Sequence, residues 1–291
     1  MTDFAYLVWD PSPSLFNFNI PILNRPILWY GFLFAFGFFV GYLVLIRLLR
    51  RYFLEEEGKG ISLNALKAMV TQRAEQLTFY VILGAVVGSR LGDVLFYQNW
   101  SDLTRHPLSV IAVWEGGLAS HGGAAGILIA VWLFAKRRKI PFWTAVDFTV
   151  IPTAIAAVFI RIGNFFNQEI LGIPTTVQWG VIFMHPADGG AIVPRHPAQL
   201  YEAAWYLCSF FLLLWYSRRH PPFKPIGSLT GLFLLLVFGG RILIEFLKIE
   251  QSSHVWLTSL LTMGQVLSLP FIALGVWLFY RRHSARTQSS S

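Results

Sequence analysis

The segment Arg161-Ile-Gly-Asn164-Phe-Phe-Asn167-Gln-Glu169 decides how this 291-residue chain can fold. It places a permanent cation, two amides and a carboxylate at the end of a run, residues 144–164, that is otherwise apolar enough to span a membrane. Charge inside a bilayer costs several kcal/mol and is kept mainly where it has a function. The segment therefore predicts a polar site, suited to an anion, buried in an integral membrane protein.

The composition of the whole chain agrees with a membrane protein. Apolar residues make up 55% of the sequence, the mean hydropathy is +0.55 and only 13% of residues are charged, whereas soluble domains carry about a quarter. The net charge is +8, and the residues that carry it lie mostly between apolar runs, which argues against a nucleic-acid-binding protein. The single Cys208 excludes an internal disulfide and a Cys-rich metal site. Residues 1–10 lack a basic segment and contain two aspartates, so we expect no cleavable signal peptide.

Seven apolar runs are long enough to cross the hydrocarbon core as helices, which takes about 20 residues each. They predict an all-α, polytopic membrane helical bundle that forms one domain, residues 1–283, followed by a polar, disordered tail, residues 284–291. Pro152, inside the fourth run, predicts a kink. The expected spans cover residues 27–48, 77–97, 117–135, 144–164, 197–217, 228–247 and 263–280.

The basic residues between these runs predict the orientation. Sixteen of the 23 Lys and Arg residues fall on one side of a seven-span arrangement, and such residues mark the cytoplasmic side. The N-terminus is therefore expected outside and the C-terminus in the cytoplasm. Six or eight spans would break this agreement. The seven basic residues on the outer side are Arg25, Arg90, Arg105, Arg161, Arg195, Arg241 and Lys248.

Three of these outer basic residues, Arg25, Arg105 and Lys248, are interpreted as loop or headgroup contacts, an interpretation that fits Arg90, Arg161 and Arg241 less well.

Glycines also recur at a spacing of four residues, which predicts close packing between helices. They are Gly37/Gly41, Gly84/Gly88/Gly92 and Gly122/Gly126.

Several expected spans bring polar side chains to the same outer depth. Arg161 with Asn164 and Asn167 is the strongest group, because a guanidinium binds phosphate bidentately and amides add donors; the alternative is an anchor for lipid headgroups. The other candidates are Tyr30, Arg90, Asp93, His121, Glu169, His196, Glu202, Arg241 and Glu245.

Each of the remaining candidates has a structural alternative. Arg241 and Glu245, four residues apart, could neutralise each other on one helix face, and so could Arg90 and Asp93. His121 is either a structural histidine or a candidate base, since histidine titrates near neutrality. The sequence contains no His-Glu-x-x-His zinc motif, no Gly-x-Ser-x-Gly elbow and no Gly-rich phosphate loop, so no metal or cofactor is expected.

Five segments resemble, in order, those of the bacterial prolipoprotein diacylglyceryl transferases. The resemblance runs from about Leu28 to about Tyr280, and the number of spans agrees. The Arg-x-Gly-Asn-Phe-x-Asn-x-Glu block is the most specific. The segments are Trp114-Glu-Gly-Gly-Leu-Ala-Ser-His121-Gly-Gly, Arg161 to Glu169, Pro194-Arg-His196-Pro-Ala-Gln199-Leu-Tyr-Glu202, Arg241-x-x-x-Glu245-Phe and Met263-Gly264-Gln265-Val-Leu-Ser268.

The resemblance implies an enzyme that transfers the diacylglyceryl group of phosphatidylglycerol to the lipobox cysteine of a preprolipoprotein, the first step of lipoprotein maturation. The product is a thioether, and glycerol-1-phosphate leaves. Its partners would be phosphatidylglycerol, membrane lipid and the signal-peptide region of the preprotein. Its place would be the bacterial inner membrane, with the active site toward the periplasmic leaflet. Fixed cations would then stabilise the charge that develops on the leaving phosphate ester.

The resemblance also implies roles. Arg161 would hold the phosphatidylglycerol headgroup, with Asn164 and Glu169 fixing it and the glycerol hydroxyls. Arg241 would share the phosphate charge or position the leaving group, with Glu245 orienting it, and His121 would be the base for the incoming thiol. Tyr30 would donate a hydrogen bond near the headgroup, and Glu202 and His196 would shape the pocket wall. The chain departs from many members in having Val237 four residues before Arg241 and Lys248 in place of an arginine.

Three other functions fit parts of the pattern. An organic-anion transporter would use the same arginines but would also need polar residues in the inner halves of the spans, which are nearly all apolar. A lipid phosphatase or another headgroup transferase would need paired histidines with Arg and Asp at set spacing, which are not found here. A purely structural subunit would leave Arg161, Arg241 and Glu202 without a purpose.

Overall fold

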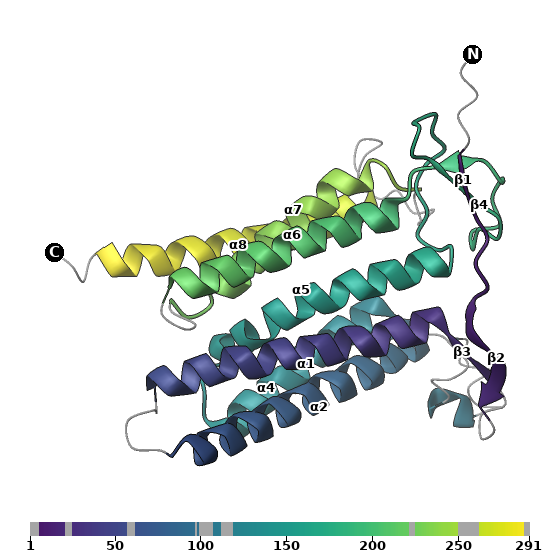
Figure 1. The fold of residues 1–291 in the computed structure, drawn as a ribbon. Helices are drawn as coiled ribbons and strands as arrows, with labels where there is room; N and C mark the ends of the chain where they lie inside the picture. Colours follow the sequence, from purple (N-terminus) through teal and green to yellow (C-terminus); the bar gives the residue numbers. More distant parts are fainter. Residues whose placement is uncertain are drawn as a thin grey trace. The chain divides into compact units, whose positions relative to one another are not determined.

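The computed structural model describes residues 6–20, 25–56, 62–96, 98, 107–111, 119–220, 225–249 and 262–287 (Figure 1). The helices in these ranges are α1 (Trp29–Glu56), α2 (Leu63–Phe96), α4 (Ser120–Arg138), α5 (Phe142–Phe166), α6 (Ala198–Arg219), α7 (Ser228–Glu245) and α8 (Met263–Thr287), together with a 3-10 helix, η1 (Pro107–Ile111). Each of the seven expected spans falls on one α-helix, which confirms the prediction of a helical bundle. Helices α1, α2, α5 and α7 are long and apolar enough to cross a membrane.

The helices extend beyond the expected spans at several ends. Residues 49–76 were expected between two spans, but α1 continues to Glu56 and α2 begins at Leu63. The start of α2 is helical because Leu66, Val70 and Ala74 recur every four residues and are buried, while charged residues lie between them. Helix α8 likewise continues to Thr287, into the stretch expected to be a disordered tail.

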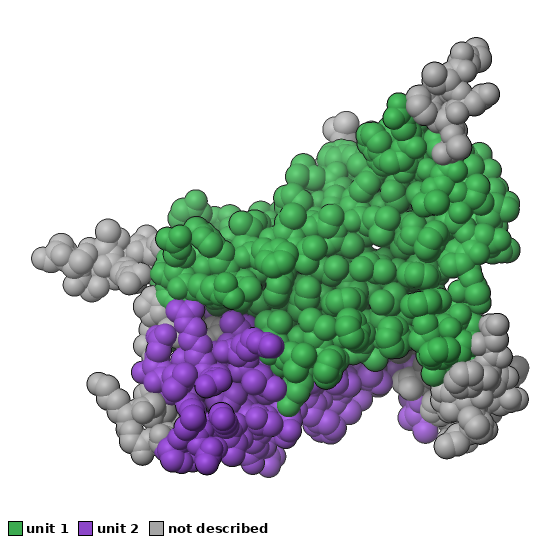
Figure 2. All heavy atoms as spheres, in the orientation of Figure 1, with its two compact units in different colours: residues 1–44, 150–291 green, residues 45–149 purple. Residues whose placement is uncertain are grey.

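The chain divides into two compact units (Figure 2). Unit 1 comprises residues 1–44 and 150–291, and unit 2 comprises residues 45–149. The division runs through α1 and α5, so each of these helices contributes to both units.

Unit 2 is built around a seam of glycines between α2 and α4. A Cβ atom at Gly88 would lie 2.8 Å from the Cα of Gly126, and one at Gly92 would lie 2.8 Å from the Cα of Gly122. The two backbones are therefore in direct contact, as small residues allow in membrane helices. The packing predicted from the glycine spacing is confirmed.

Unit 1 uses glycines in a similar way. In the first half of α1, Gly37 packs against Ala156 of α5, and Gly41 packs against Pro152, which lies inside α5 as expected. The indole of Trp205 in α6 lies against Gly240 of α7 and donates to the Leu236 carbonyl at 2.7 Å. Helices α7 and α8 also pack against each other (Figure 1).

Short strands form a small cap in unit 1 that the sequence did not predict. Strand β1 (Leu7–Trp9) pairs in parallel with β4 (Val181–Phe183), which pairs antiparallel with β5 (Pro194–Arg195). A second pair joins β2 (Ser14–Ile20) and β3 (Arg25–Leu28). Four of these five strands have four residues or fewer, too short for a recognisable alternation.

The cap has its own apolar core, which holds the end of α5. The core consists of Phe165, Leu171, Val181 and Phe183, with Trp9 packed against it. The Trp9 indole donates to the Phe165 carbonyl at 3.0 Å. Because Phe165 follows Asn164 and Leu171 follows Glu169 closely, this core fixes the loop that carries the polar residues.

Candidate active site

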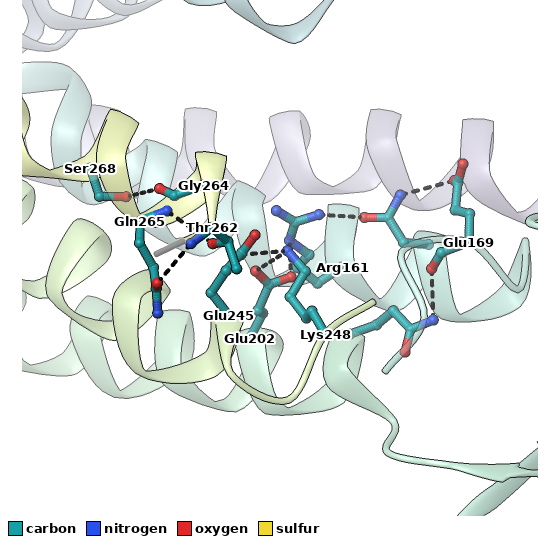
Figure 3. A network of polar contacts seen from close by, with 11 residues as sticks. Arg161, Glu169, Glu202, Glu245, Lys248, Thr262, Gly264, Gln265 and Ser268 are labelled. Carbon is teal, nitrogen blue, oxygen red and sulfur yellow. Dashed lines mark hydrogen bonds and ion pairs between the residues drawn. The ribbon is translucent and has the colours of Figure 1, made fainter. Parts of the chain in front are cut away.

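Arg161 lies at the centre of a polar network in unit 1 (Figure 3). Its Nε lies 2.9 Å from Glu202 Oε2 of α6, an ion pair without hydrogen-bond geometry, and its Nη1 donates to Asn164 Oδ1 at 3.0 Å. The ring of Tyr206 lies 5.9 Å from the guanidinium carbon. The Glu202 side chain is 1% exposed and that of Arg161 is 16% exposed, so the carboxylate is buried while part of the arginine side chain remains accessible.

Glu169 accepts hydrogen bonds from side-chain amides within the segment Arg161 to Glu169. Asn164 Nδ2 donates to Glu169 Oε1 at 2.9 Å, and Asn167 Nδ2 donates to the same oxygen at 3.2 Å. Gln199 Nε2, at the start of α6, donates to the Glu169 carbonyl at 2.7 Å. The two asparagine amides therefore hold a carboxylate within the protein, where the sequence alone suggested that they face a phosphate.

The backbone on both sides of Glu169 is strained. Gln168 has φ 52° and Ile170 has φ 58°, the left-handed region that a β-branched residue rarely adopts. Tertiary contacts hold this conformation: Gln168 Oε1 accepts from the His185 amide at 2.7 Å, and the Gln168 carbonyl accepts from the Ala187 amide at 2.9 Å. Such strain is typical of functional loops, where it orients a side chain in advance.

Lys248 connects α6 and α7 through two carboxylates. Its Nζ lies 3.4 Å from Glu202 Oε1 and 3.2 Å from Glu245 Oε2, and its side chain is 5% exposed. The interpretation of Lys248 as a loop or headgroup contact is therefore wrong. A buried ammonium needs such partners, because an unpaired charge in this environment is costly.

The Met263-Gly264-Gln265 segment brings the start of α8 into contact with this network. Thr262 and Gln265 form a capping box, in which the Gln265 amide donates to Thr262 Oγ1 at 3.3 Å and the Thr262 amide donates to Gln265 Oε1 at 3.1 Å. Gln265 Nε2 also donates to the Ile242 carbonyl at 3.2 Å. Gly264 lies against the Glu245 carboxylate so closely that a Cβ atom would overlap it.

The structure thus joins six of the predicted site residues through side-chain contacts: Arg161, Asn164, Asn167, Glu169, Glu202 and Glu245. Tyr30 lies beside this group, since its ring packs on Gly163 and its phenol interacts electrostatically with Arg161 and Glu169.

Three predicted residues lie outside the network. His196 contacts Tyr201 instead, with Nδ1 3.1 Å from the hydroxyl. Arg241 makes no ion pair with any residue that the structure describes, and Glu245 pairs with Lys248, so mutual neutralisation of Arg241 and Glu245 is not observed. His121 is exposed on α4, in unit 2. Residues 114–118 of its motif lie outside the described residues.

Arg90 is held by contacts within unit 2. Nε donates to the Val110 carbonyl at 3.1 Å, Nη1 pairs with Asp93 Oδ2 at 3.3 Å, and Nη2 donates to the Ser109 carbonyl. Its side chain therefore anchors η1 to α2. The pairing of Arg90 with Asp93 that the structural alternative predicts is observed.

The network is suited to an anion at Arg161. A guanidinium carries five N–H donors in a planar fork, and the contacts to Glu202 and Asn164 engage only Nε and Nη1. Donors therefore remain for a phosphate oxygen. The neighbouring carboxylates orient the guanidinium and limit the positive charge that it presents.

The chain resembles known proteins over most of its length. A profile described as prolipoprotein diacylglyceryl transferase matches residues 17–281. A protein of Tolumonas auensis is 41% identical over 94% of this chain and 96% of its own length, and one of Porphyromonas gingivalis is 39% identical over 97% and 96%. A protein of Protochlamydia amoebophila is 32% identical over 96% of each chain. All three are named phosphatidylglycerol–prolipoprotein diacylglyceryl transferase.

This chain belongs to the prolipoprotein diacylglyceryl transferase family. The resemblance read from the five segments is confirmed. Membership of this transferase family and the long apolar helices together indicate a multi-pass protein of the bacterial inner membrane.

Three residues of this family member have roles that the sequence did not predict. Gln199 is fully buried and holds the main chain of Glu169, Gln265 caps α8 and reaches α7, and Lys248 bridges two carboxylates. Gln199 and Gln265 stand within the segments that carry the family resemblance, which was the available signal. No signal in the sequence pointed to burial of Lys248, because it follows α7 by only three residues in an expected loop.

Proposed function

We propose that this chain transfers the diacylglyceryl group of phosphatidylglycerol to the lipobox cysteine thiol of a preprolipoprotein. The cysteine sulfur attacks the glycerol carbon that bears the phosphate ester, so that a carbon–sulfur bond forms as the carbon–oxygen bond breaks. The thiol proton passes to a base, and glycerol-1-phosphate leaves with the bonding electron pair. Family membership supports this reaction, since the named relatives carry this activity in their names.

The observation that carries the proposal is the largely buried Arg161, held at Nε by Glu202 and at Nη1 by Asn164. In this proposal the remaining donors of the guanidinium bind the donor phosphate and stabilise the charge that develops on it as the ester bond breaks. Asn164, Asn167 and Glu169 fix the position of Arg161 and of the headgroup. Tyr30, which packs on Gly163, donates a hydrogen bond near the headgroup.

The remaining roles rest on the family resemblance. His121 is the proposed base for the thiol, whose thiolate is the competent nucleophile. Arg241 shares the phosphate charge, Glu245 orients the cationic groups through Lys248, and His196 shapes the pocket wall through its contact with Tyr201.

We also propose seven membrane spans, with the N-terminus outside, the C-terminus in the cytoplasm and the active site toward the periplasmic leaflet. The support is the coincidence of each expected span with one helix and the distribution of sixteen basic residues on one side.

The test uses purified protein in phosphatidylglycerol vesicles with a lipobox peptide. Mass spectrometry would follow a diacylglyceryl mass on the cysteine, together with released glycerol-1-phosphate. We expect both products with the wild type and a loss of about 100-fold or more in Arg161→Ala, because a fixed donor to a developing oxyanion is worth that much.

The matched control is Arg137→Ala, which removes an exposed arginine at the end of α4 and should keep wild-type turnover. Normal turnover by Arg161→Ala would refute the phosphate site. If the folded wild type forms neither product, the transferase proposal fails, and anion flux in the same vesicles would test the transporter alternative.

A further inference from the structure

The segment that follows α7 is hydrogen-bonded to the loop that follows Glu169. Lys248 forms an antiparallel bridge with Gly172, which lies so close to His196 that a Cβ atom would overlap its carbonyl oxygen. Two main-chain hydrogen bonds flank the bridge, from Ile173 N to Leu247 O (3.0 Å) and from Ile249 N to Leu171 O (3.1 Å). The position of Lys248 is therefore set by the backbone, independently of its charge.

The side chain of Lys248 shares Glu202 with Arg161. One oxygen of this carboxylate lies 2.9 Å from Arg161 Nε, and the other lies 3.4 Å from Lys248 Nζ. Glu202 is 1% exposed, so its charge is balanced by these two cations and not by water. Lys248 Nζ also reaches Glu245 at 3.2 Å, which gives an alternating chain of charges that ends at Arg161.

The charge balance shows what Lys248 contributes. The side-chain network contains three carboxylates, Glu169, Glu202 and Glu245, and two cations, Arg161 and Lys248. Without Lys248, Arg161 would be the one cation within this contact network, against three carboxylates. An anionic phosphate approaching Arg161 would then meet a more negative environment, and Glu202 would draw the guanidinium more strongly to itself.

Resting on the proposed function, we propose that Lys248 is a positioning residue that acts through Glu202 and sets how strongly Arg161 holds the donor phosphate. It does not touch the donor itself. A lysine suits this task, because its compact ammonium can donate to two carboxylates that belong to different helices.

The experiment measures kcat and KM for phosphatidylglycerol, diluted in a zwitterionic phospholipid, with the lipobox peptide saturating. We expect Lys248→Met to raise the KM about tenfold with a much smaller change in kcat, since the lost charge acts on donor binding. Lys248→Arg should stay within about threefold of the wild type, because it keeps the charge. Lys136→Met is the matched control, since Lys136 is exposed near the end of α4 and should leave both constants unchanged.

A double variant keeps the proposal falsifiable if Lys248→Met folds poorly. Glu202→Gln combined with Lys248→Met removes one negative and one positive charge, which restores the wild-type net charge of the network. Its KM should return at least halfway, on a logarithmic scale, toward that of the wild type. A KM as high as in the single variant, or a single variant that loses kcat at an unchanged KM, would overturn the proposal.

The proposed function and this inference fail in different ways. If the wild type does not modify the peptide, the transferase proposal itself fails. If the wild type is active and the KM of Lys248→Met equals that of the wild type, only the positioning role of Lys248 is lost.

Discussion

Arg90 in unit 2 and Arg161 in unit 1 are both arginines within long apolar helices, but they are held in different ways. Arg90 donates to two main-chain carbonyls and pairs with Asp93, and its side chain is 7% exposed. Within the described part of the chain, Arg161 contacts side chains; it is 16% exposed and shares its carboxylate partner with Lys248. An arginine bound to main-chain carbonyls fixes the fold, whereas one bound to shared side chains can exchange a contact for a ligand.

The helices around the two arginines differ in the same sense. In unit 2, α2 and α4 meet at glycines, where the two backbones are in direct contact. In unit 1, α6, α7 and α8 also pack at glycines such as Gly240, but they are connected in addition through polar side chains such as Glu202, Lys248 and Gln265. The first arrangement tolerates no added atom, and the second can respond to a bound anion.

The largest effect that would sharpen this comparison is expected in the glycine seam. In Gly126→Ala the new Cβ would overlap the Gly84 carbonyl oxygen and lie 2.8 Å from the Gly88 Cα. Both obstacles are backbone, so the helices must separate, and we expect a stability loss of more than about 3 kcal/mol. Thermal unfolding in detergent, followed by circular dichroism, measures it.

The control for the seam is Gly239→Ala in α7, where a Cβ would meet nothing within 4 Å. Alanine is the better helix former, so this variant should gain about 0.5–1 kcal/mol. Equal unfolding temperatures for the two variants would contradict the distinction between an occupied and an open position.

A smaller effect separates the two arginines. Arg90→Met leaves the carbonyls of Ser109 and Val110 without this donor, while Asp93 keeps its bond from Gln98 Nε2 at 2.7 Å. We expect a stability loss of about 2 kcal/mol, with wild-type turnover per folded molecule. Unfolding and product mass spectrometry on the same preparation measure both. A fully stable but inactive Arg90→Met would place this arginine in the chemistry instead of the fold.

The sequence predicted the parts of the molecule that follow from local pattern. The seven apolar runs each became one α-helix, the glycine spacing at Gly84, Gly88 and Gly92 became a helix contact, and the Arg161–Glu169 segment became the centre of the polar network. These features depend on residues that are close in sequence, so their periodicity and chemistry are visible without a fold.

What the sequence could not predict depends on contacts between distant segments. From the sequence alone Lys248 is expected in a loop, because its place in the structure depends on the pairing of its backbone with residues 171–173. The short strands have no sequence pattern of their own. The contacts of Asn164 and Asn167 with Glu169 were not predicted either, because the turn with positive φ at Gln168 and Ile170 brings Glu169 back onto both amides.

The smallest predicted effect concerns the capping box of α8, formed by Thr262 and Gln265, which holds the start of this helix beside the polar network in unit 1. Thr262→Ala removes the hydroxyl that accepts from the Gln265 amide and should cost about 1 kcal/mol, the usual worth of an N-cap. Ser268→Ala is the matched control, since its hydroxyl only donates to the Gly264 carbonyl within the same helix and its loss should be close to neutral. Because Gln265 keeps its bond to the Ile242 carbonyl, Thr262→Ala should lower the unfolding temperature slightly and leave the KM for the donor unchanged. A raised KM would show that the polar network in unit 1 depends on the capping box of α8 as strictly as unit 2 depends on its glycines. The contrast between an adaptable region in unit 1 and a rigid region in unit 2 would then be lost.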